Sequence, residues 1–224
     1  NPVTPLGSAL SHESAHLHVS GEAKYVDDFP LVPGLLHAQI LPSPVAAGLL
    51  RGIQVEAAKK VPGVVDVLVA EDIPGANDAS PVFHDEPFLA SGELYSYGQS
   101  ICVVVAESVE ACRVGASQVD LDIDEREPIL TIQEAIEKGS FQGDVAHIGH
   151  GDVDSALAKS DIRFSGEVET GGQDHFYLES QIAQVTPLED GCYHVESSTQ
   201  HPSEVQTKIA ELLGIGRHRV VVRC

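Results

Sequence analysis

Residues 100–124 constrain the fold of this chain more than any other part of its sequence. Residues 100–106 (SICVVVA) form a continuous apolar run, which is typical of a strand buried on both faces. Ser108 can then cap a helix over residues 109–118. Residues 119–124 (VDLDID) alternate between apolar and acidic side chains, which indicates a half-buried strand with a solvated acidic edge. A strand, a helix and a strand at this spacing predict an α/β unit.

Shorter patterns on either side predict further strands and helices, separated by Pro- and Gly-rich turns. The expected strands cover residues 17–21, 21–28, 35–41, 51–55, 64–70, 162–170, 176–186, 192–198 and 219–224. The expected helices are one or two turns at 56–61, a helix at 132–138, a short helix capped by Asp152 or Asp154, and a helix at 202–213 that opens on Pro202. A polar, Pro-rich loop follows residue 70, and glycines mark residues 131–150 as a connector between two units.

The stretch Gly171–Glu179 (GGQDHFYLE) concentrates the polar side chains that a buried site needs. Its glycine pair permits backbone conformations and close approaches that other residues avoid. Gln173 and two further polar residues follow at once, where an ordinary strand would alternate apolar and polar residues. The pattern alone favours structural roles instead, with Phe176 and Leu178 on a core face, His175 in a hydrogen bond and Tyr177 as a buried anchor.

The charge balance excludes some classes of function. With 34 acidic and 13 basic residues the net charge is −21, which repels phosphate backbones and excludes a nucleic-acid role. The tetrapeptide HIGH at residues 147–150, a signature of class I aminoacyl-tRNA synthetases, is therefore interpreted as a chance match. No apolar run reaches the length of a membrane span, and no signal-peptide pattern opens the chain.

The cysteines and the two ends of the sequence indicate the setting of the chain. The cysteines are Cys102, Cys112, Cys192 and Cys224. They lack the spacing of zinc or iron–sulfur ligands, so we interpret them as reduced packing residues of a cytoplasmic protein. The chain opens without Met and closes on an apolar run, Arg219–Cys224, so we expect it to be a piece of a longer protein.

Residues 12–16 (HESAH) match the H-E-x-x-H zinc motif. The motif works only on a helix, where both imidazoles share one face and the glutamate polarises metal-bound water. Prolines and a glycine precede it here, and the following residues indicate an extended chain, so we expect an exposed polar loop. A zinc hydrolase using His12, Glu13 and His16 is therefore the least favoured of the functions considered.

A series of short motifs runs through nearly the whole chain. They are HES (12–14), HVSGEA (18–23), YVDD (25–28), VPGV (61–64), DIPG (72–75), DEP (85–87), YGQ (97–99), VVVA (103–106), GDVD (151–154), GQDHFYLE (172–179) and STQ (198–200). In this order they resemble the molybdenum-cofactor subunit of the xanthine dehydrogenase and aldehyde oxidase family, in particular its bacterial xanthine dehydrogenases. The resemblance implies an α+β protein: a lead-in at 1–14, an α/β hammerhead domain at 15–130, a linker at 131–150 and the truncated start of an α/β molybdopterin-binding domain at 151–224.

The resemblance also implies site residues. In this family the glutamine of the corresponding segment lies beside molybdenum and hydrogen-bonds one of its oxygen ligands; by motif it is Gln173, with Gly172 beside the cofactor. A neutral amide can donate such a bond without adding charge. No residue of the chain is expected to ligate the metal directly. Glu169 and Glu179 match no motif position of the family's catalytic base, which is expected beyond Cys224.

Enzymes of this family hydroxylate a carbon next to a ring nitrogen with oxygen from water, and pass electrons through iron–sulfur clusters and FAD to NAD. We therefore expect a fragment of a cytoplasmic molybdenum hydroxylase of purine catabolism, acting on xanthine or hypoxanthine. The fragment alone is expected to be inactive and to bind no cofactor. Its expected partners are the iron–sulfur and FAD domains or subunit, a second copy of the complex and a purine, but no nucleic acid and no membrane.

Two alternatives remain open. One is another hydroxylase of the same architecture that acts on aldehydes, nicotinate or carbon monoxide. The other is a noncatalytic interaction module, in which the acidic strand at residues 119–124 docks on a basic surface of a partner.

Overall fold

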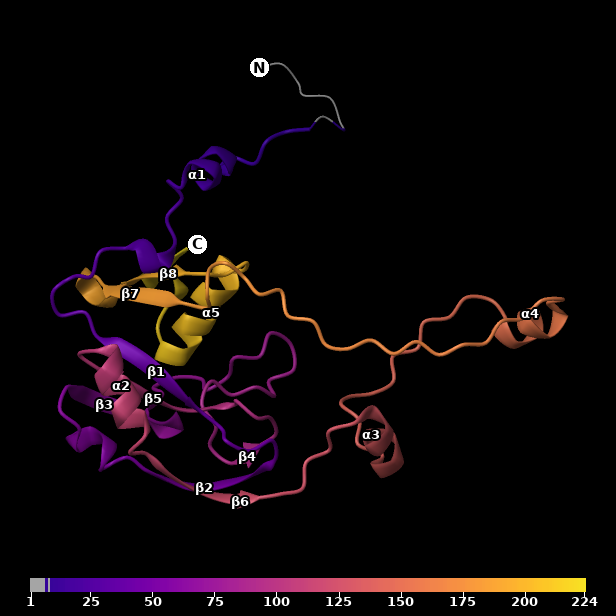
Figure 1. Ribbon diagram of the computed structural model, residues 1–224, viewed down its shortest axis with the longest axis horizontal. Coiled ribbons are helices and arrows are strands. Elements are labelled where there is room, and N and C mark those ends of the chain that lie inside the picture. The colour runs from indigo at the N-terminus through magenta and orange to yellow at the C-terminus, as the bar shows by residue number, and fades with distance from the viewer. Residues whose placement is uncertain (1–6, 8) are drawn as a thin grey trace. The chain divides into compact units, whose positions relative to one another are not determined.

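The computed structural model describes residue 7 and residues 9–224, which form two compact units (Figure 1). One unit combines Asn1–Arg126 with Leu178–Cys224, and the other is Glu127–Tyr177. Of the lead-in expected at 1–14, residues 1–6 and 8 lie outside the described part.

The strands are β1 (His37–Pro42), β2 (Gly48–Gln54), β3 (Val64–Leu68), β4 (Glu93–Leu94), β5 (Ser100–Ala106), β6 (Asp120–Glu125), β7 (Ala183–Pro187), β8 (Tyr193–Ser197) and β9 (Val220–Arg223). The helices are α1 (Ala15–Ser20), α2 (Val109–Ala116), α3 (Ile132–Lys138), α4 (Val153–Lys159) and α5 (Pro202–Leu213). Short 3-10 helices cover Val26–Asp28, Ala58–Lys60, Ala70–Asp72, Glu189–Gly191 and Arg217–Arg219.

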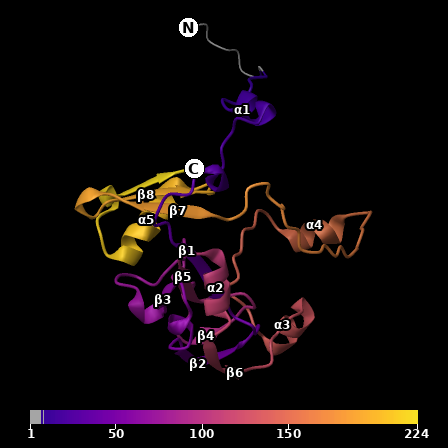
Figure 2. The ribbon, with the colours of Figure 1, turned by 60° about the vertical axis from the view of Figure 1, so that its left-hand side comes forward.

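Strand β5 is the centre of an antiparallel sheet with the order β1-β5-β3. It occupies the predicted residues 100–106, and Ile101 and Cys102, which point to opposite faces, are both fully buried. Helix α2 packs on this sheet (Figure 2), and the Cys112 thiol donates to the carbonyl of Val104. The strand and helix predicted from the apolar run and its cap are confirmed.

A second antiparallel sheet has the order β4-β2-β6. The predicted alternation of β6 is confirmed, because Leu121 and Ile123 are half-buried whereas the acidic residues that alternate with them, Asp120, Asp122 and Asp124, are exposed. Leu50 of β2 and Leu94 of β4 belong to the same hydrophobic cluster as the buried residues of β5. The two sheets therefore share one core.

The third sheet has the order β7-β8-β9. Strand β8 pairs antiparallel with β7 and parallel with β9, and α5 connects the two parallel strands. Ala210 of α5 packs with Val195 and Val220 in a second cluster. Helix α5 spans the predicted residues and ends at Gly214, which has a left-handed conformation with φ of 64°.

The unit Glu127–Tyr177 contains α3 and α4 as its regular elements. Thr131 caps α3 by accepting from the Glu134 amide, and Asp152 caps α4 by accepting from the Ser155 amide. Both predicted helices are confirmed, with Asp152 as the cap of the second.

Several predicted strands are wrong. Residues 15–20 form α1 and Val26–Asp28 form a 3-10 helix, because the Asp28 carboxylate accepts from the Tyr25 amide and so favours a local turn over a strand. Residues 162–170 form no strand, since no strand of the described chain pairs with them. The strand predicted at 176–186 begins only at Ala183.

Candidate functional site

The segment from Gly171 to Leu178 is an exposed stretch without regular secondary structure. A Cβ atom added at Gly172 would meet nothing within 4 Å, so the backbone there is open to a neighbouring group. The Gln173 side chain is exposed as well. The two residues that the motif assigns to the cofactor are therefore accessible.

The rest of this segment forms a local turn. The Phe176 amide donates to the Asp174 carboxylate over 2.7 Å, and Phe176 has a φ of 51°. The rings of His175 and Tyr177 stack at 5.3 Å with an interplanar angle of 6°. This turn breaks the extended alternation that a strand requires.

The structural roles favoured by the pattern alone are wrong. Phe176 and Leu178 are 93% and 88% exposed instead of facing a core. Tyr177 is also exposed, so it is no buried anchor, and the contact found for His175 is ring stacking rather than a core hydrogen bond.

The chain becomes anchored directly after this segment. Oε1 of Glu179 accepts a hydrogen bond from the backbone amide of Val26 over 2.9 Å. Oγ of Ser198 accepts from the Ile182 amide and donates to the carbonyl of Ser180, over 3.0 and 2.9 Å. Sequence reasoning considered Glu179 only as a replacement base and missed this anchor; its contact partner is 153 residues away, so no local pattern reveals it.

The residues of the zinc-like motif are not arranged on one helix. His12 precedes α1, whereas His16 lies within it, and Nδ1 of His12 accepts from the Ser14 amide. The extended chain expected after the motif is wrong, because α1 continues to Ser20. Within residues 7 and 9–224, no three histidine, cysteine or acidic side chains come together as a metal site.

The four cysteines of the described chain are free thiols. Cys102 and Cys112 are buried, and burial raises the pKa of the Cys102 thiol to about 11. Cys192 is half-buried and Cys224 is exposed, so the predicted packing role fits the first two cysteines best.

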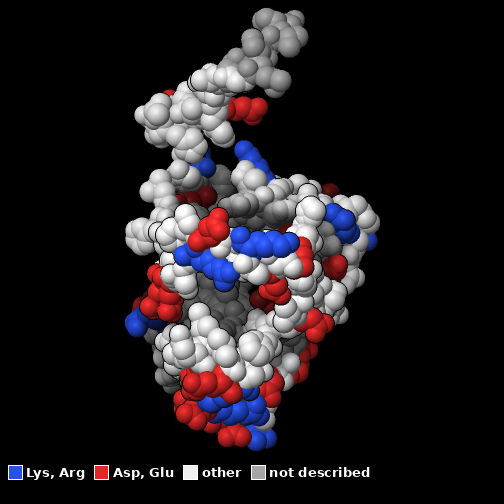
Figure 3. Space-filling model, turned by 90° about the vertical axis from the view of Figure 1, so that its right-hand side faces the viewer, with Lys and Arg blue, Asp and Glu red and all other residues white. Residues whose placement is uncertain are grey.

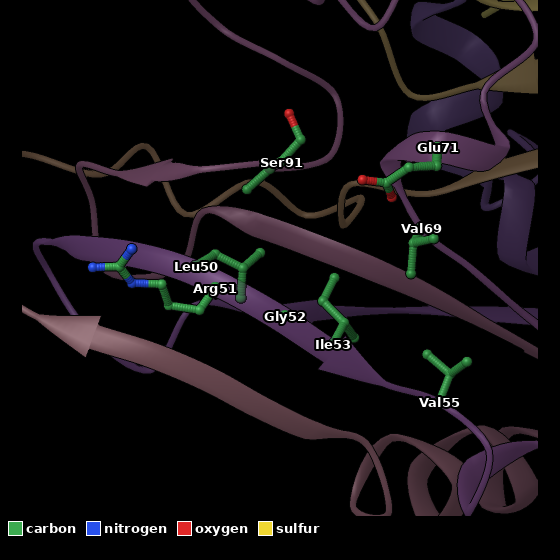
Figure 4. A pocket seen from close by; sticks show the side chains of 9 residues that line it. Leu50, Arg51, Gly52, Ile53, Val55, Val69, Glu71 and Ser91 are labelled. Atoms are coloured by element: carbon green, nitrogen blue, oxygen red, sulfur yellow. The ribbon is translucent and has the colours of Figure 1, made fainter.

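A hollow of about 300 Å³ lies along β2 (Figure 4). Ile53 and Val69 point toward each other across it, and Glu71 lies beside it. Its other charged side chain, Arg51, is paired with Asp124 at 2.8 Å. None of the residues assigned to the cofactor lines this hollow, and its lining is mainly aliphatic.

Acidic side chains are spread over the molecular face drawn in Figure 3, with smaller groups of basic side chains among them. None of the helices in the described residues has the length and apolar character needed to cross a bilayer.

Comparison with known proteins assigns both parts of the chain. The protein-family model described as "Aldehyde oxidase and xanthine dehydrogenase, a/b hammerhead domain" matches residues 20–127, and the "Molybdopterin cofactor-binding domain" matches residues 136–224. The fold and the candidate site thus define a hammerhead domain followed by the start of a molybdopterin-binding domain. The chain belongs to the xanthine dehydrogenase and aldehyde oxidase family.

Similar curated proteins include xanthine dehydrogenase of Oryza sativa, which is 37% identical over 98% of this chain, and aldehyde oxidase 4 of Rattus norvegicus, which is 37% identical over 96%. The chain spans 16% of the length of each of these relatives.

Solved structures show the same fold. Aldehyde oxidoreductase from Desulfovibrio gigas superposes with a TM-score of 0.81 at 23% identity, covering 94% of this chain and 25% of that one. Quinoline 2-oxidoreductase from Pseudomonas putida 86 gives 0.79 at 24% identity, covering 97% of this chain and 30% of that one. The predicted α+β fold with a hammerhead domain is confirmed.

Proposed function

We propose that this chain is part of the molybdenum-binding portion of a xanthine dehydrogenase that hydroxylates xanthine or hypoxanthine. The observation that carries the proposal is the 37% identity to a xanthine dehydrogenase over 98% of the chain, including the match to the cofactor-binding domain. The motif order found in the sequence agrees with it. On its own, the chain is expected to be inactive, because it spans 16% of the length of this relative.

Gln173 and Gly172 are the residues that we propose to meet the cofactor. The exposed Gln173 amide is a neutral donor, and the open backbone at Gly172 leaves room for a bulky group, so both residues fit a molybdopterin site. When bound, the cofactor supplies the centre that activates water-derived oxygen and accepts the electrons of the oxidation. The part of this chain is to donate a hydrogen bond from Gln173 and orient that centre.

The partners belong to the same proposal. Electrons would leave through iron–sulfur clusters and FAD, carried by other domains or a partner subunit, and reach NAD. We also propose that the complex is a cytoplasmic homodimer acting in purine catabolism.

Replacing Gln173 with Ala in the complete protein, purified with its partners, tests this proposal. We expect xanthine-dependent NAD reduction to fall about 10- to 100-fold, because the loss of one hydrogen bond to a metal ligand typically costs this much. Metal analysis should find molybdenum in the unsubstituted protein. Gln142→Ala is the matched control, since Gln142 is an exposed glutamine of the same unit, and it should leave turnover unchanged.

Absence of molybdenum, or turnover that is indifferent to Gln173, would contradict the proposal. An aldehyde-oxidising enzyme is the second candidate, because aldehyde oxidase 4 matches this chain with the same 37% identity. A higher kcat/KM for an aldehyde than for xanthine, measured on the same preparation, would favour it.

A further inference from the structure

Glu179 differs from every residue around it in the chain. Between residues 156 and 180 it is the one residue of the described structure that is not exposed, although a carboxylate is normally among the most exposed groups. Partial burial of a charged side chain requires a compensating hydrogen bond. This makes Glu179 a candidate for a specific role in holding the chain.

The contact of Glu179 supplies that bond. Val26 is the first residue of the 3-10 helix Val26–Asp28, so its amide has no acceptor within that helix. The neighbouring Tyr25 amide is satisfied locally by Asp28, whereas the Val26 amide donates to Glu179 over 2.9 Å. A hydrogen bond to an ionised carboxylate is shorter and stronger than one between neutral groups.

The residues after Glu179 are held as well. Ser198 binds the carbonyl of Ser180 and the amide of Ile182 through one hydroxyl, which fixes the chain to the end of β8. Glu179 is therefore the first fixed point that follows the exposed Gln173 segment along the chain. Glu179 lies six positions after Gln173, a span that reaches at most about 20 Å when fully extended.

We propose that Glu179 is a positioning residue, which anchors the carboxyl end of the Gln173 segment to the 3-10 helix Val26–Asp28. The effect of this anchor on turnover rests on the proposed function of Gln173, whereas the anchor itself does not. Without it, the exposed segment would be tethered only from Ser180 onward and would sample more conformations.

Hydrogen exchange in the complete protein tests the anchor directly. Glu179→Ala should speed exchange of amides in a peptide covering residues 25–29 about tenfold, the loss expected for a hydrogen bond to a charged group. Glu179→Gln retains an acceptor oxygen and should restore most of the protection. Glu169→Ala, at an exposed glutamate of the neighbouring segment, is the control and should change nothing.

The donor side gives a second test that does not alter Glu179. In Val26→Pro the amide is removed, yet proline suits the first position of a helix, and Tyr25 already has the extended conformation that precedes a proline. In turnover assays Glu179→Ala and Val26→Pro should each lower kcat with little change in KM, and the double variant should be no worse than either alone. Glu179→Gln should recover most of kcat.

The outcomes separate the two proposals. Unchanged exchange at residues 25–29 in Glu179→Ala, or additive effects of the two substitutions, would overturn the anchor whatever Gln173 does. Faster exchange combined with turnover that is indifferent to Gln173→Ala would keep the anchor and reject the proposed role of Gln173.

Discussion

Asp78 lies in the polar, Pro-rich loop that follows residue 70 and links this loop to helix α5. Its carboxylate accepts from Nδ1 of His84 and from the Ser80 amide, and it lies 3.7 Å from Nζ of Lys208 in α5. The hydrogen bond from His84 is the largest of the causes that hold the pKa of Asp78 well below its usual range. A loop that the sequence marks only as polar and Pro-rich is thus organised around one carboxylate.

This arrangement predicts an acid sensitivity. Because the folded-state pKa of Asp78 is lowered, its stabilising contribution is present above the unfolded-state pKa, about 4, and is lost as the pH falls toward the folded-state value. Asp78→Asn should therefore lower the melting temperature at pH 7 and have a smaller effect below about pH 3. Thermal melts from pH 2.5 to 7 measure this, with the exposed Asp161→Asn as the control. Parallel profiles for Asp78→Asn and the unsubstituted chain would contradict it.

Helix α2 shows how a short element depends on both its cap and its packing. Oγ of Ser108 accepts from the Ala111 amide over 3.1 Å, as the sequence predicts, and Cys112 and Ala116 are buried against the sheet. A helix of eight residues is too short to be stable alone, so packing supplies most of its stability.

Replacing Ser108 with Ala should lower the free energy of unfolding by about 1 kcal/mol, because one amide at the start of α2 loses its acceptor. Denaturant unfolding followed by circular dichroism measures the change. Ser140→Ala, at an exposed serine outside the helices, should shift the midpoint far less. If Ser108→Ala lowers the free energy of unfolding no more than Ser140→Ala does, the cap adds no stability beyond that of packing.

At the scale of the whole molecule, a loop of the hammerhead part contacts the end of α5, the helix that packs on the third sheet. The amides of Gly75 and Ala76 donate to the carbonyls of Leu212 and Glu211 at the end of α5, both over 2.9 Å. Both carbonyls belong to the last turn of α5, where the Glu211 carbonyl also accepts from the Gly214 amide, so the loop adds donors at the end of the helix. A Cβ atom at Gly75 would lie 2.0 Å from the Glu211 oxygen, so no other residue fits this contact.

Gly75→Ala should therefore separate the loop from α5 and destabilise the chain by about 2 kcal/mol or more, because backbone atoms must move and two hydrogen bonds are lost. The substitution should speed amide hydrogen exchange more in α5 than in β5, and the thermal unfolding transition should broaden. Gly92→Ala is the control, since a Cβ there meets nothing within 4 Å. A single sharp transition with unchanged protection of α5 would contradict this coupling.

The sequence by itself determined the elements whose stability is local or whose pattern is strong, such as β5, α2, α3 and α5, and its motif order identified the family. It also singled out Gln173, whose role remains a proposal. The tertiary structure alone decided which segments became strands, because a strand needs a partner: residues 183–187 pair with β8, whereas residues 162–170 pair with no strand of the described chain. It likewise revealed the contacts of Glu179 and Gly75, since both join residues more than a hundred positions apart, a distance at which no sequence periodicity carries information.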